Sequence, residues 1–458
     1  MMLAREQMRF LRYVLATVVG LVVVLAVVPD RPLIVSRPVE RLASVVVRGR
    51  DGAAPRLAVV APTAGGAAGA VDEAIGVFGD DLAFEAAFEL AALDEVDGLA
   101  APAREGDAGL RQWGERGVDG VLVVQPAVEG DRLRMAVRAF DVASGQVAFA
   151  REYLGPADAP RTIGHVMANE LHAAQANLHG VATTSLAFVS DRSGAKREPT
   201  GYMRRVKEIF VADYDGANQR RVTFDGDIVL TPSWSPDGAG LAYTSFQSGF
   251  QAVAFAKPGA GRDGRLRVGG KNWLPAWAPD GRRIAFTSNR DGNEEIYVAN
   301  RDGSGLTRLT RHWAIDTSPA WSPDGNRIAF TSGRSGRPQI WIMDADGANQ
   351  RQLTDERYCD RPTWSPPPFD EIAYVSRTKT GFDIKVIEVA TGVARQLTYG
   401  EGFNESPAWA PSGRHLAFTS TRVGGQQIWT MTRNGERLRQ VTRVGNNSMP
   451  AWGPLPGL

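Results

Sequence analysis

Five histidines are the residues of this sequence that could hold a metal ion. Three of them, His165, His172 and His179, recur at intervals of seven within one predicted helix. Seven residues make two helical turns, or about 10 Å, so no two of these imidazoles can bind the same ion. The other two, His312 and His415, are far apart in the chain and have no cysteine beside them. We therefore interpret the first three as an ordinary polar stripe on a helix, and we expect no metal site and no cofactor.

The sequence also lacks the common motifs of a catalytic nucleophile. Cys359 is the only cysteine, so no intramolecular disulfide can form. A serine nucleophile of the α/β-hydrolase type needs Gly-x-Ser-x-Gly, whose sharp turn exposes the hydroxyl, and the sequence does not contain this motif. Residues 56–180 also lack Gly-x-Gly-x-x-Gly and any other phosphate-binding loop. We expect no catalytic residues.

A tryptophan motif recurs through the second half of the chain. Pro-x-Trp occurs six times, with its tryptophans 43, 44, 43, 45 and 43 residues apart. Three copies continue into Pro-Asp-Gly, a tight turn in which proline presets φ, Asp bonds its own backbone and Gly takes positive φ. We interpret the tryptophans as packing between neighbouring repeats. They are Trp234, Trp277, Trp321, Trp364, Trp409 and Trp452.

Each repeat contains four short segments of alternating hydrophobicity, such as 284–288 and 340–343, with turns between them. Four strands in about 44 residues are typical of one blade of a β-propeller. The first repeat, from Leu186, has no Pro-x-Trp before it, and the last Pro-x-Trp, at 450–452, has no repeat after it. We predict that residues 181–458 form a six-bladed propeller. Its C-terminal strand completes the first blade and closes the ring, which removes exposed sheet edges.

Residues 56–180 lack this period and alternate between strand and helix patterns, which predicts a small α/β domain. Residues 29–55 are expected to form a linker and the N-terminal segment of the mature chain. The predicted strands are 56–61 and 121–124, with a hairpin of 133–140 and 146–153, and the predicted helices are 80–96, 110–116 and 160–178.

The first 28 residues have the layout of an export signal. Three arginines precede an uncharged apolar run from Val14 to Val28. Its 15 residues are few for a spanning helix, which needs about 20, and residues 24–26 would suit a cleavage site. Two interpretations stay open: a cleaved signal peptide, or a retained anchor at residues 10–28. Both place the folded part outside the cytoplasm.

The overall charge argues against two classes of partner. Lys and Arg number 52 and Asp and Glu 51, for a net charge of +1. Such a balance gives no reason to expect nucleic acid or a membrane surface as partner. We expect a monomer.

The order of these parts resembles the TolB family, the periplasmic propeller proteins of the Tol-Pal cell-envelope system. The repeat itself is shared with the propellers of dipeptidyl-peptidase-like and prolyl-oligopeptidase-like enzymes. The succession of export signal, α/β domain and six blades is more specific. The α/β domain is also similar to the family at 113–124, 140–146 and 161–165. The resemblance covers about residues 44 to 454, and it departs in two turns, at 366–369 and at Ser412.

This resemblance implies a non-enzymatic periplasmic adaptor that supports outer-envelope integrity and constriction during cell division. Its propeller would bind the peptidoglycan-associated lipoprotein Pal, and residues 44–60 would bind TolA. The stretch 27–43 before that segment is longer than the family pattern, which puts the TolA contact in doubt.

In the family the Pal contact lies in the loops just before Pro-x-Trp. Trp273 is outside the tryptophan register, which makes it the best candidate for an exposed anchor, although it could equally pack on its neighbouring loop. The matching positions are Lys271, Asn272, Trp273, Leu274, Asp316, Thr317, Asp360, Arg361, Asn404, Glu405, Asn446 and Asn447.

The first repeat carries an insertion. Between Ser190 and Ile209 lie 18 residues, where the corresponding interval from Ser332 to Ile340 has 7. Either this is a solvated loop, or it is a basic arm that steers an acidic partner onto the propeller. Its basic residues are Lys196, Arg197, Arg204, Arg205 and Lys207.

Three alternative functions are consistent with a propeller fold. A prolyl-oligopeptidase-like enzyme needs a hydrolase domain, and the six residues after Trp452 are too few for one. A propeller lyase or hydrolase would need histidines or carboxylates at matching strand positions, which the five histidines do not supply. A generic cytoplasmic scaffold would require the first 30 residues to be neither signal nor anchor.

Overall fold

The structure, a computed structural model, describes residues 24–26, 33–39, 45–61, 68–194, 196–197 and 204–456. The chain folds into two compact units, which meet in the sequence between Thr183 and Thr184. Among the described residues, no helix is both long and apolar enough to cross a bilayer. The predicted signal or anchor, residues 1–28, lies outside the described residues except for Val24–Ala26.

The N-terminal unit is built on a seven-stranded mixed sheet in the order β1-β2-β7-β6-β5-β3-β4. β3 pairs in parallel with β4 and β5, and the other neighbours are antiparallel. β6 and β7 confirm the predicted hairpin. The strands are β1 (Val24–Ala26), β2 (Ile34–Pro38), β3 (Arg56–Val60), β4 (Glu89–Leu90), β5 (Gly120–Glu129), β6 (Arg132–Asp141) and β7 (Val147–Pro156), and the helices are α1 (Ala68–Glu85), α2 (Leu110–Glu115) and α3 (Pro160–Ala176).

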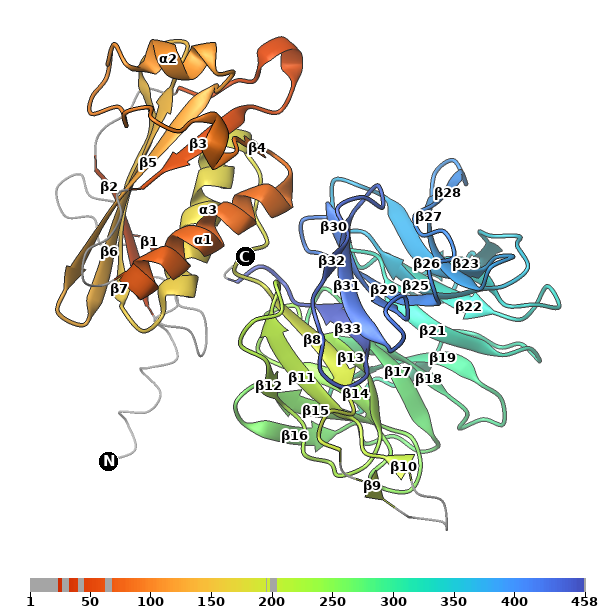
Figure 1. Cartoon of the computed structure of the whole chain (residues 1–458). Coiled ribbons are helices and arrows are strands. Elements are labelled where there is room, and N and C mark those ends of the chain that lie inside the picture. Colours follow the sequence, from red (N-terminus) through yellow and green to blue (C-terminus); the bar gives the residue numbers. More distant parts are fainter. Residues whose placement is uncertain are drawn as a thin grey trace. The chain divides into compact units, whose positions relative to one another are not determined.

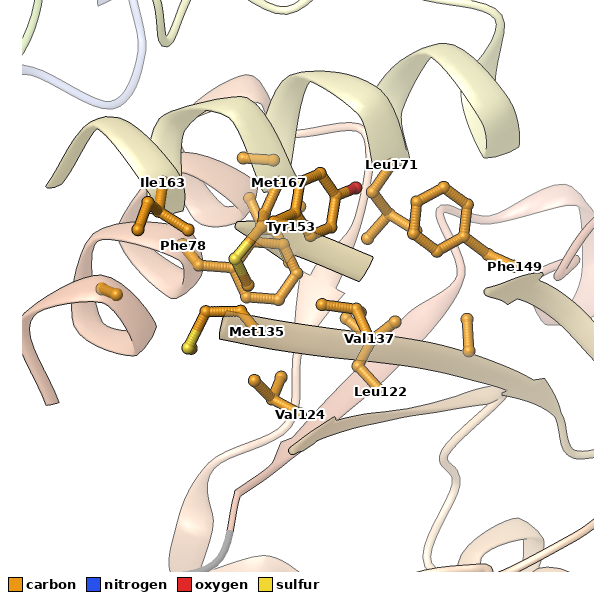
Figure 2. Packing of buried hydrophobic residues seen from close by; sticks show 14 of the residues in the cluster. Phe78, Leu122, Val124, Met135, Val137, Phe149, Tyr153, Ile163, Met167 and Leu171 are labelled. Atoms are coloured by element: carbon orange, nitrogen blue, oxygen red, sulfur yellow. The ribbon is translucent and has the colours of Figure 1, made fainter. Parts of the chain in front are cut away.

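The core of this unit lies between the sheet and helices α1 and α3, which run side by side on one of its faces (Figure 1). In Figure 2, Phe78 of α1 and Met167 of α3 pack against Met135 of β6. Because side chains alternate along a strand, Leu122 of β5 faces these helices. Its neighbour Val121 faces the other side, where Trp113 of α2 is buried.

The predicted helix at 80–96 is wrong in its second half. α1 ends at Glu85, and Ala86 has a φ of 57°, a left-handed conformation that an α-helix cannot continue. Beyond it, Glu89 and Leu90 pair with β3 as the short edge strand β4. Short apolar stretches suit a helix or a strand equally well, and here the pairing with β3 decides for the strand.

Residues 29–55, expected as a linker and N-terminal segment, contain an integral strand of the sheet. β2 pairs with β7 from Val35 opposite Leu154 to Pro38 opposite Arg151. Ile34 is only 3% exposed, and its side chain leaves no room for any Cβ at Gly155. Ser36 is also buried, and its Oγ donates a hydrogen bond to Glu170 Oε2 of α3 at 2.7 Å.

The histidines of α3 are not the polar stripe that their spacing predicted. His165 and His172 are both buried, each at 1% exposure, because α3 packs against α1 and β7 along that side. His165 Nδ1 lies 2.7 Å from Asp81 Oδ2 of α1, and His172 Nδ1 lies 2.8 Å from the carbonyl oxygen of Ala168. Only His179, beyond the end of the helix, is exposed.

The second unit consists of six four-stranded antiparallel sheets, arranged as the blades of a propeller (Figure 1). The first blade has the order β12-β11-β8-β33, so the C-terminal strand supplies its innermost strand and closes the ring, as predicted. Blade 1 has β8 (Ser185–Ser190), β11 (Glu208–Asp213), β12 (Arg220–Arg221) and β33 (Asn447–Trp452); blade 2 has β13 (Val229–Trp234), β14 (Leu241–Ser245), β15 (Ala252–Lys257) and β16 (Gly261–Arg265); blade 3 has β17 (Asn272–Trp277), β18 (Arg283–Ser288), β19 (Glu295–Asn300) and β20 (Thr307–Arg308). Blade 4 has β21 (Asp316–Trp321), β22 (Arg327–Ser332), β23 (Gln339–Asp344) and β24 (Arg351–Gln352); blade 5 has β25 (Cys359–Trp364), β26 (Glu371–Arg377), β27 (Phe382–Glu388) and β28 (Ala394–Gln396); blade 6 has β29 (Asn404–Trp409), β30 (His415–Ser420), β31 (Gln427–Thr432) and β32 (Arg439–Gln440).

A buried polar link holds the short fourth strand in place in five blades. In blade 3, Glu295 Oε2 accepts a hydrogen bond from Thr310 Oγ1 at 2.6 Å, and Thr310 Oγ1 accepts one from the N–H of Ile296 at 2.9 Å. Blade 2 has Ala252 at the place of the glutamate, so it cannot form this link. Because the threonine is the second residue after the fourth strand, this hydrogen bond holds the start of the loop that leads to the next blade. The five pairs are Glu208–Thr223, Glu295–Thr310, Gln339–Thr354, Asp383–Thr398 and Gln427–Thr442.

Candidate functional site

The innermost strand of every blade carries the same backbone irregularity just before its proline. In β17 the pairing with β18 shifts between Trp273 and Ala276, and Leu274 takes a φ of 53°. A left-handed non-glycine residue costs about 1–3 kcal/mol and persists only where the surroundings enforce it; here strand pairing on both sides of the bulge does so. The six residues and the prolines that follow them surround a central cavity of about 150 Å³. The left-handed residues are Thr231, Leu274, Ser318, Arg361, Ser406 and Met449.

The connections between strands emerge alternately on two faces of the propeller, because each blade is antiparallel. We call one face the loop face; its connections join second to third strands, and fourth strands to the next blade. The other is the turn face, which includes the Pro-Asp-Gly turns. Among the described residues, the loop face comprises 191–194, 196–197, 204–207, 222–228, 246–251, 266–271, 289–294, 309–315, 333–338, 353–358, 378–381, 397–403, 421–426 and 441–446, and the turn face comprises 214–219, 235–240, 258–260, 278–282, 301–306, 322–326, 345–350, 365–370, 389–393, 410–414 and 433–438.

Four of the twelve predicted partner-binding residues are buried inside the blades, which corrects that part of the prediction. Each is the first residue of an inner strand, and its side chain bonds the adjoining loop. Asn447 Nδ2, for example, donates to the carbonyl oxygen of Val444 at 3.0 Å. These side chains hold the loops in place and cannot meet a partner. The four are Asn272, Asp316, Asn404 and Asn447.

The other eight predicted residues remain accessible at the loop face or along the inner strands. Trp273 is half-buried in β17 opposite Thr287, so it has neither the full exposure of a free anchor nor the burial of a core residue. Arg361 Nη1 donates to Ser406 Oγ at 3.0 Å beside the central cavity. Lys271 and Asn446 are exposed, and Trp273, Leu274, Thr317, Asp360, Arg361 and Glu405 are half-buried.

Asp316 shows how the loop face is anchored from within. It is fully buried and accepts a hydrogen bond from Arg334 Nη2 at 2.5 Å. Burial raises the pKa of the Asp316 carboxyl, against the opposing effect of this hydrogen bond. The guanidinium of Arg334 also stacks over Phe330 and Trp341, at 5.6 and 5.3 Å from the ring centroids. The arginine is therefore part of the blade and not a free surface charge.

Cys359 occupies the same first position in blade 5. It is fully buried, and burial raises the pKa of its thiol to about 12. A thiol held protonated in this way is a poor nucleophile. The residue therefore acts as a small core side chain.

Sequence reasoning missed the most exposed apolar residues of the propeller. Trp313 is 79% exposed, in the loop between β20 and β21. Like Trp273 it lies outside the Pro-x-Trp register, which is the signal that could have drawn attention to it. Eight of the ten exposed large apolar residues among the described part of the propeller lie on the loop face. They are Phe224, Phe250, Trp313, Ile315, Tyr399, Phe403, Val423 and Val444; Val393 and Leu438 lie on the turn face.

The two faces also differ in charge. Over the described residues, the connections of the loop face contain sixteen Lys and Arg and eight Asp and Glu, whereas those of the turn face contain five Lys and Arg and eight Asp and Glu. The overall net charge of +1 hides this asymmetry. The loop face thus combines exposed apolar side chains with an excess of basic residues in its connections.

The insertion in the first repeat contributes a small hairpin to this face. β9 (Lys196–Arg197) pairs antiparallel with β10 (Arg204–Arg205). Arg205 is largely exposed, and its Nη1 lies 3.5 Å from Asp191 Oδ2. The backbone of Lys207 forms an isolated parallel β-bridge with that of Ile228. Both interpretations offered for the insertion remain predictions.

The Pro-x-Trp tryptophans pack between blades, as predicted. Trp234, Trp321 and Trp409 each donate the indole N–H to a backbone carbonyl of the preceding blade, at 3.2 Å. The acceptors are Ala451, Ala276 and Thr363. Each such bond ties neighbouring inner strands together.

In the N-terminal unit, the segment just before β3 is packed onto the domain. Val47 is buried, and its N–H donates to Gln175 Oε1 of α3 at 3.0 Å. Arg50 pairs with Asp119 at 3.3 Å. A cavity of about 810 Å³ lies beside this segment, lined in part by Arg48 and Arg111.

The sequence profile of the TolB beta propeller domain matches residues 176–456, which is more than half of the chain. The chain belongs to the TolB family. The resemblance drawn from the sequence is thereby confirmed.

Named relatives of this family match parts of the chain. A protein called TolB homolog from Chlorobium chlorochromatii is 35% identical over 41% of this chain and 40% of its own length. The Tol-Pal system protein TolB of Desulfosudis oleivorans is 34% identical over 51% of each chain. The chain thus spans about half or less of these curated relatives.

The fold agrees over a greater length. The crystal structure of TolB from Acinetobacter baumannii aligns with a TM-score of 0.75 over 91% of this chain and all of that one, at 24% identity. A structural match at this sequence identity shows that the two proteins share a fold, an α/β unit and a six-bladed propeller.

Proposed function

We propose that this chain is a non-enzymatic adaptor of the Tol-Pal system in the periplasm. It binds Pal through the loop face and supports outer-envelope integrity and constriction during cell division. Membership of the TolB family and the relatives named Tol-Pal system protein TolB support the proposal. The single observation that carries it is the loop face, which gathers eight exposed large apolar residues and an excess of basic residues in its connections.

The physical argument is that such a face suits a protein partner. Interfaces take their energy from a few apolar, often aromatic, anchors, and complementary charge around them speeds and orients association. The excess of lysine and arginine predicts that Pal presents an acidic surface.

Trp313→Ala tests this assignment. The residue is 79% exposed, and its ring lies beside that of the neighbouring His312, 5.2 Å between centroids, whereas the indole of Trp321 donates a hydrogen bond to another blade. We expect the variant to keep its thermal stability and to lose about 2 kcal/mol of Pal affinity, roughly thirtyfold in Kd. Isothermal titration calorimetry with purified Pal would measure it. Leu438→Ala, an exposed apolar truncation on the turn face, is the control and should bind Pal like the wild type.

A second contact, with TolA, would use residues 44–60. The strand β2 precedes this segment and residues 56–60 are strand β3, so residues 45–55 would act as an internal loop between two strands of the sheet. Replacing residues 45–50 by a Gly-Ser linker should abolish TolA binding in a pull-down and leave Pal binding intact. Loss of both, or of neither, would argue against separate contacts.

The proposed location can be tested independently. A fusion of residues 1–60 to a reporter that is active only after export should be active. N-terminal sequencing of the mature protein would then distinguish a cleaved signal from a retained anchor. A reporter retained in the cytoplasm would rule out the whole Tol-Pal proposal.

A further inference from the structure

The central hairpin of blade 5 reaches further toward the loop face than its counterparts in the other blades. Its strands β26 and β27 have seven residues each, whereas the second and third strands of the other blades have five or six. The additional pair is Arg377 opposite Phe382. The turn between them is closed by the N–H of Thr378, which donates to the carbonyl oxygen of Gly381 at 2.9 Å. Blade 5 therefore holds an arginine and a phenylalanine in paired strands where the other blades already have loop.

Phe382 lies in the middle of a row of three aromatic side chains at the loop face, which we call the aromatic row. Its ring centroid is 5.6 Å from that of Tyr358 and 6.0 Å from that of Phe403. The interplanar angles of 70° and 56° are edge-to-face and tilted arrangements, which aromatic pairs favour. Tyr358 and Phe382 are half-buried, and Phe403 is 52% exposed. The row is therefore a packed cluster with one end open to solvent.

Two loops hold the exposed ring of Phe403 in position. Its backbone N–H donates to Thr421 Oγ1 at 2.8 Å, and its carbonyl oxygen accepts from the N–H of Thr421 at 3.1 Å. The ring rests on the turn of blade 5, since a Cβ at Gly381 would lie 3.0 Å from two of its carbon atoms. Phe403 thus belongs to a defined surface and is not a free side chain of a loop.

Three basic residues border the aromatic row. Arg357 directly precedes Tyr358 in the chain. Arg377 is paired with Phe382, and Lys379 lies in the turn that joins their two strands. All three are exposed, and their side chains have no hydrogen bond or ion pair with any residue that the structure describes. They are therefore available to carboxylates of a partner.

The carboxylates of the loops that form this surface, 353–358, 378–381 and 397–403, already have basic partners. Each lies within 3.2 Å of a lysine or arginine nitrogen. The pairs are Asp355–Arg337, Glu356–Lys385 and Glu401–Arg422. In the adjoining strand β29, Glu405 adds one half-buried carboxylate. The unpaired charge around the row is therefore mainly positive.

Aromatic rings beside unpaired arginine and lysine fit a polypeptide segment that carries both an apolar side chain and carboxylates. The apolar side chain would pack on Phe403, the kind of anchor from which interfaces take most of their energy, and an arginine can bind a carboxylate through two parallel hydrogen bonds. None of the three aromatic residues lines the central cavity, so this site lies beside the cavity and not in it. We propose that the aromatic row is the docking site for an acidic segment of the partner that binds the loop face. The inference rests on the proposed function, and it assigns the contact to blade 5.

Calorimetric titration of the purified full chain with Pal at low ionic strength tests the row. Phe403→Ala should weaken Pal binding about tenfold or more, because it removes the exposed anchor. Val423→Ala is the matched control, since Val423 is also 52% exposed and lies in a loop-face connection of blade 6, outside the row. It should bind Pal like the wild type, and equal melting temperatures would show that both variants are folded.

The acidic nature of the segment has its own test. Arg377→Ser should weaken Pal binding about threefold or more at low ionic strength, and the loss should shrink near about 0.5 M salt, where charges are screened. Arg282→Ser, which removes an exposed arginine of the turn face, should have no effect. If Phe403→Ala melts earlier than the wild type, this second pair of variants decides alone.

The outcomes separate this inference from the proposed function. If the wild type binds Pal and a folded Phe403→Ala variant binds it as tightly as Val423→Ala does, the row is not the docking site, although the adaptor function stands. A loss in Phe403→Ala without one in Arg377→Ser would show a purely apolar contact and overturn the acidic assignment. No binding by the wild type would overturn the proposed function and this inference together. Self-association of the chain in analytical ultracentrifugation that Phe403→Ala abolishes would assign the row to a second copy of the chain instead.

Discussion

At the scale of single residues, Glu371 is a buried charge shared by two blades. It accepts hydrogen bonds from Arg395 of blade 5 and from Arg433 of blade 6, each at 2.6 Å. Burial raises the pKa of its carboxyl, but the bonds from the two arginines more than offset this, so the pKa lies below the ordinary 4.5. The carboxylate therefore ties two neighbouring blades together at neutral pH.

Glu371→Gln should lower the free energy of unfolding by about 3 kcal/mol at neutral pH, because it leaves two arginines without their counter-charge. Since the folded-state pKa is below the unfolded value, the stabilisation is present above about pH 4.5 and is lost as the pH falls through the folded-state value. Urea unfolding of wild type and variant at about pH 7 and about pH 3 would show the difference shrinking in acid. A difference that is the same at both pH values would contradict this account.

Trp273 and Trp313 show how far sequence reasoning reaches at single residues. Both lie outside the tryptophan register, yet only the structure shows that Trp313 is the more exposed one. Exposure of a loop residue depends on how the loop folds over its neighbours, and no periodicity records that. The same reason explains why Asn272 and Asn404 were predicted at the surface and are buried.

Trp273→Ala is predicted to cost about 2 kcal/mol of Pal affinity or more if the indole is a hot spot. Its half-buried position in β17 makes a check on folding essential. Calorimetry with Pal, alongside a thermal melt, separates the two effects. Unchanged affinity in a folded variant would remove Trp273 from the interface.

At the scale of elements, the strand pattern of the propeller was predicted well because each blade repeats one period-2 pattern around the same turns. The N-terminal unit was harder. The stretch 86–96 has helix-like composition, but its conformation follows from β4 pairing with β3, a contact distant in sequence. β2 was missed for the same reason, since its place beside β7 depends on a partner more than a hundred residues away.

The β2 assignment leads to a stability prediction with a neighbouring control. Ile34→Ala should destabilise the N-terminal unit by about 2–4 kcal/mol, because the side chain is buried against β7 and α3. Leu33→Ala, one residue earlier and 44% exposed, should change it by less than about 0.5 kcal/mol. Chemical denaturation of both variants measures this, and equal effects would show that β2 is not part of the core.

At the scale of the whole molecule, the positive loop face makes association with an acidic partner sensitive to salt. Replacing Lys196, Arg197, Arg204, Arg205 and Lys207 by Ser or Gln should slow Pal association by about threefold or more at low ionic strength. Screening should remove most of the difference near about 0.5 M salt. Stopped-flow association rates over a salt series would measure it, and identical rates at every salt concentration would show that the hairpin is merely solvated.

The closure of the first blade also sets an order of assembly. The pairing of β33 with β8, reinforced by Asn446 bonding Asp191 across 255 residues of chain, unites the earliest propeller strand with the last. In a chain that is synthesised from its N-terminus, β8 pairs with β11 early but acquires its second neighbour, β33, only after every other blade has been made. Until then β8 has an unpaired edge that could pair with another chain. Losing the last dozen residues would therefore keep the whole propeller in this unfinished, aggregation-prone state, rather than merely trimming its end.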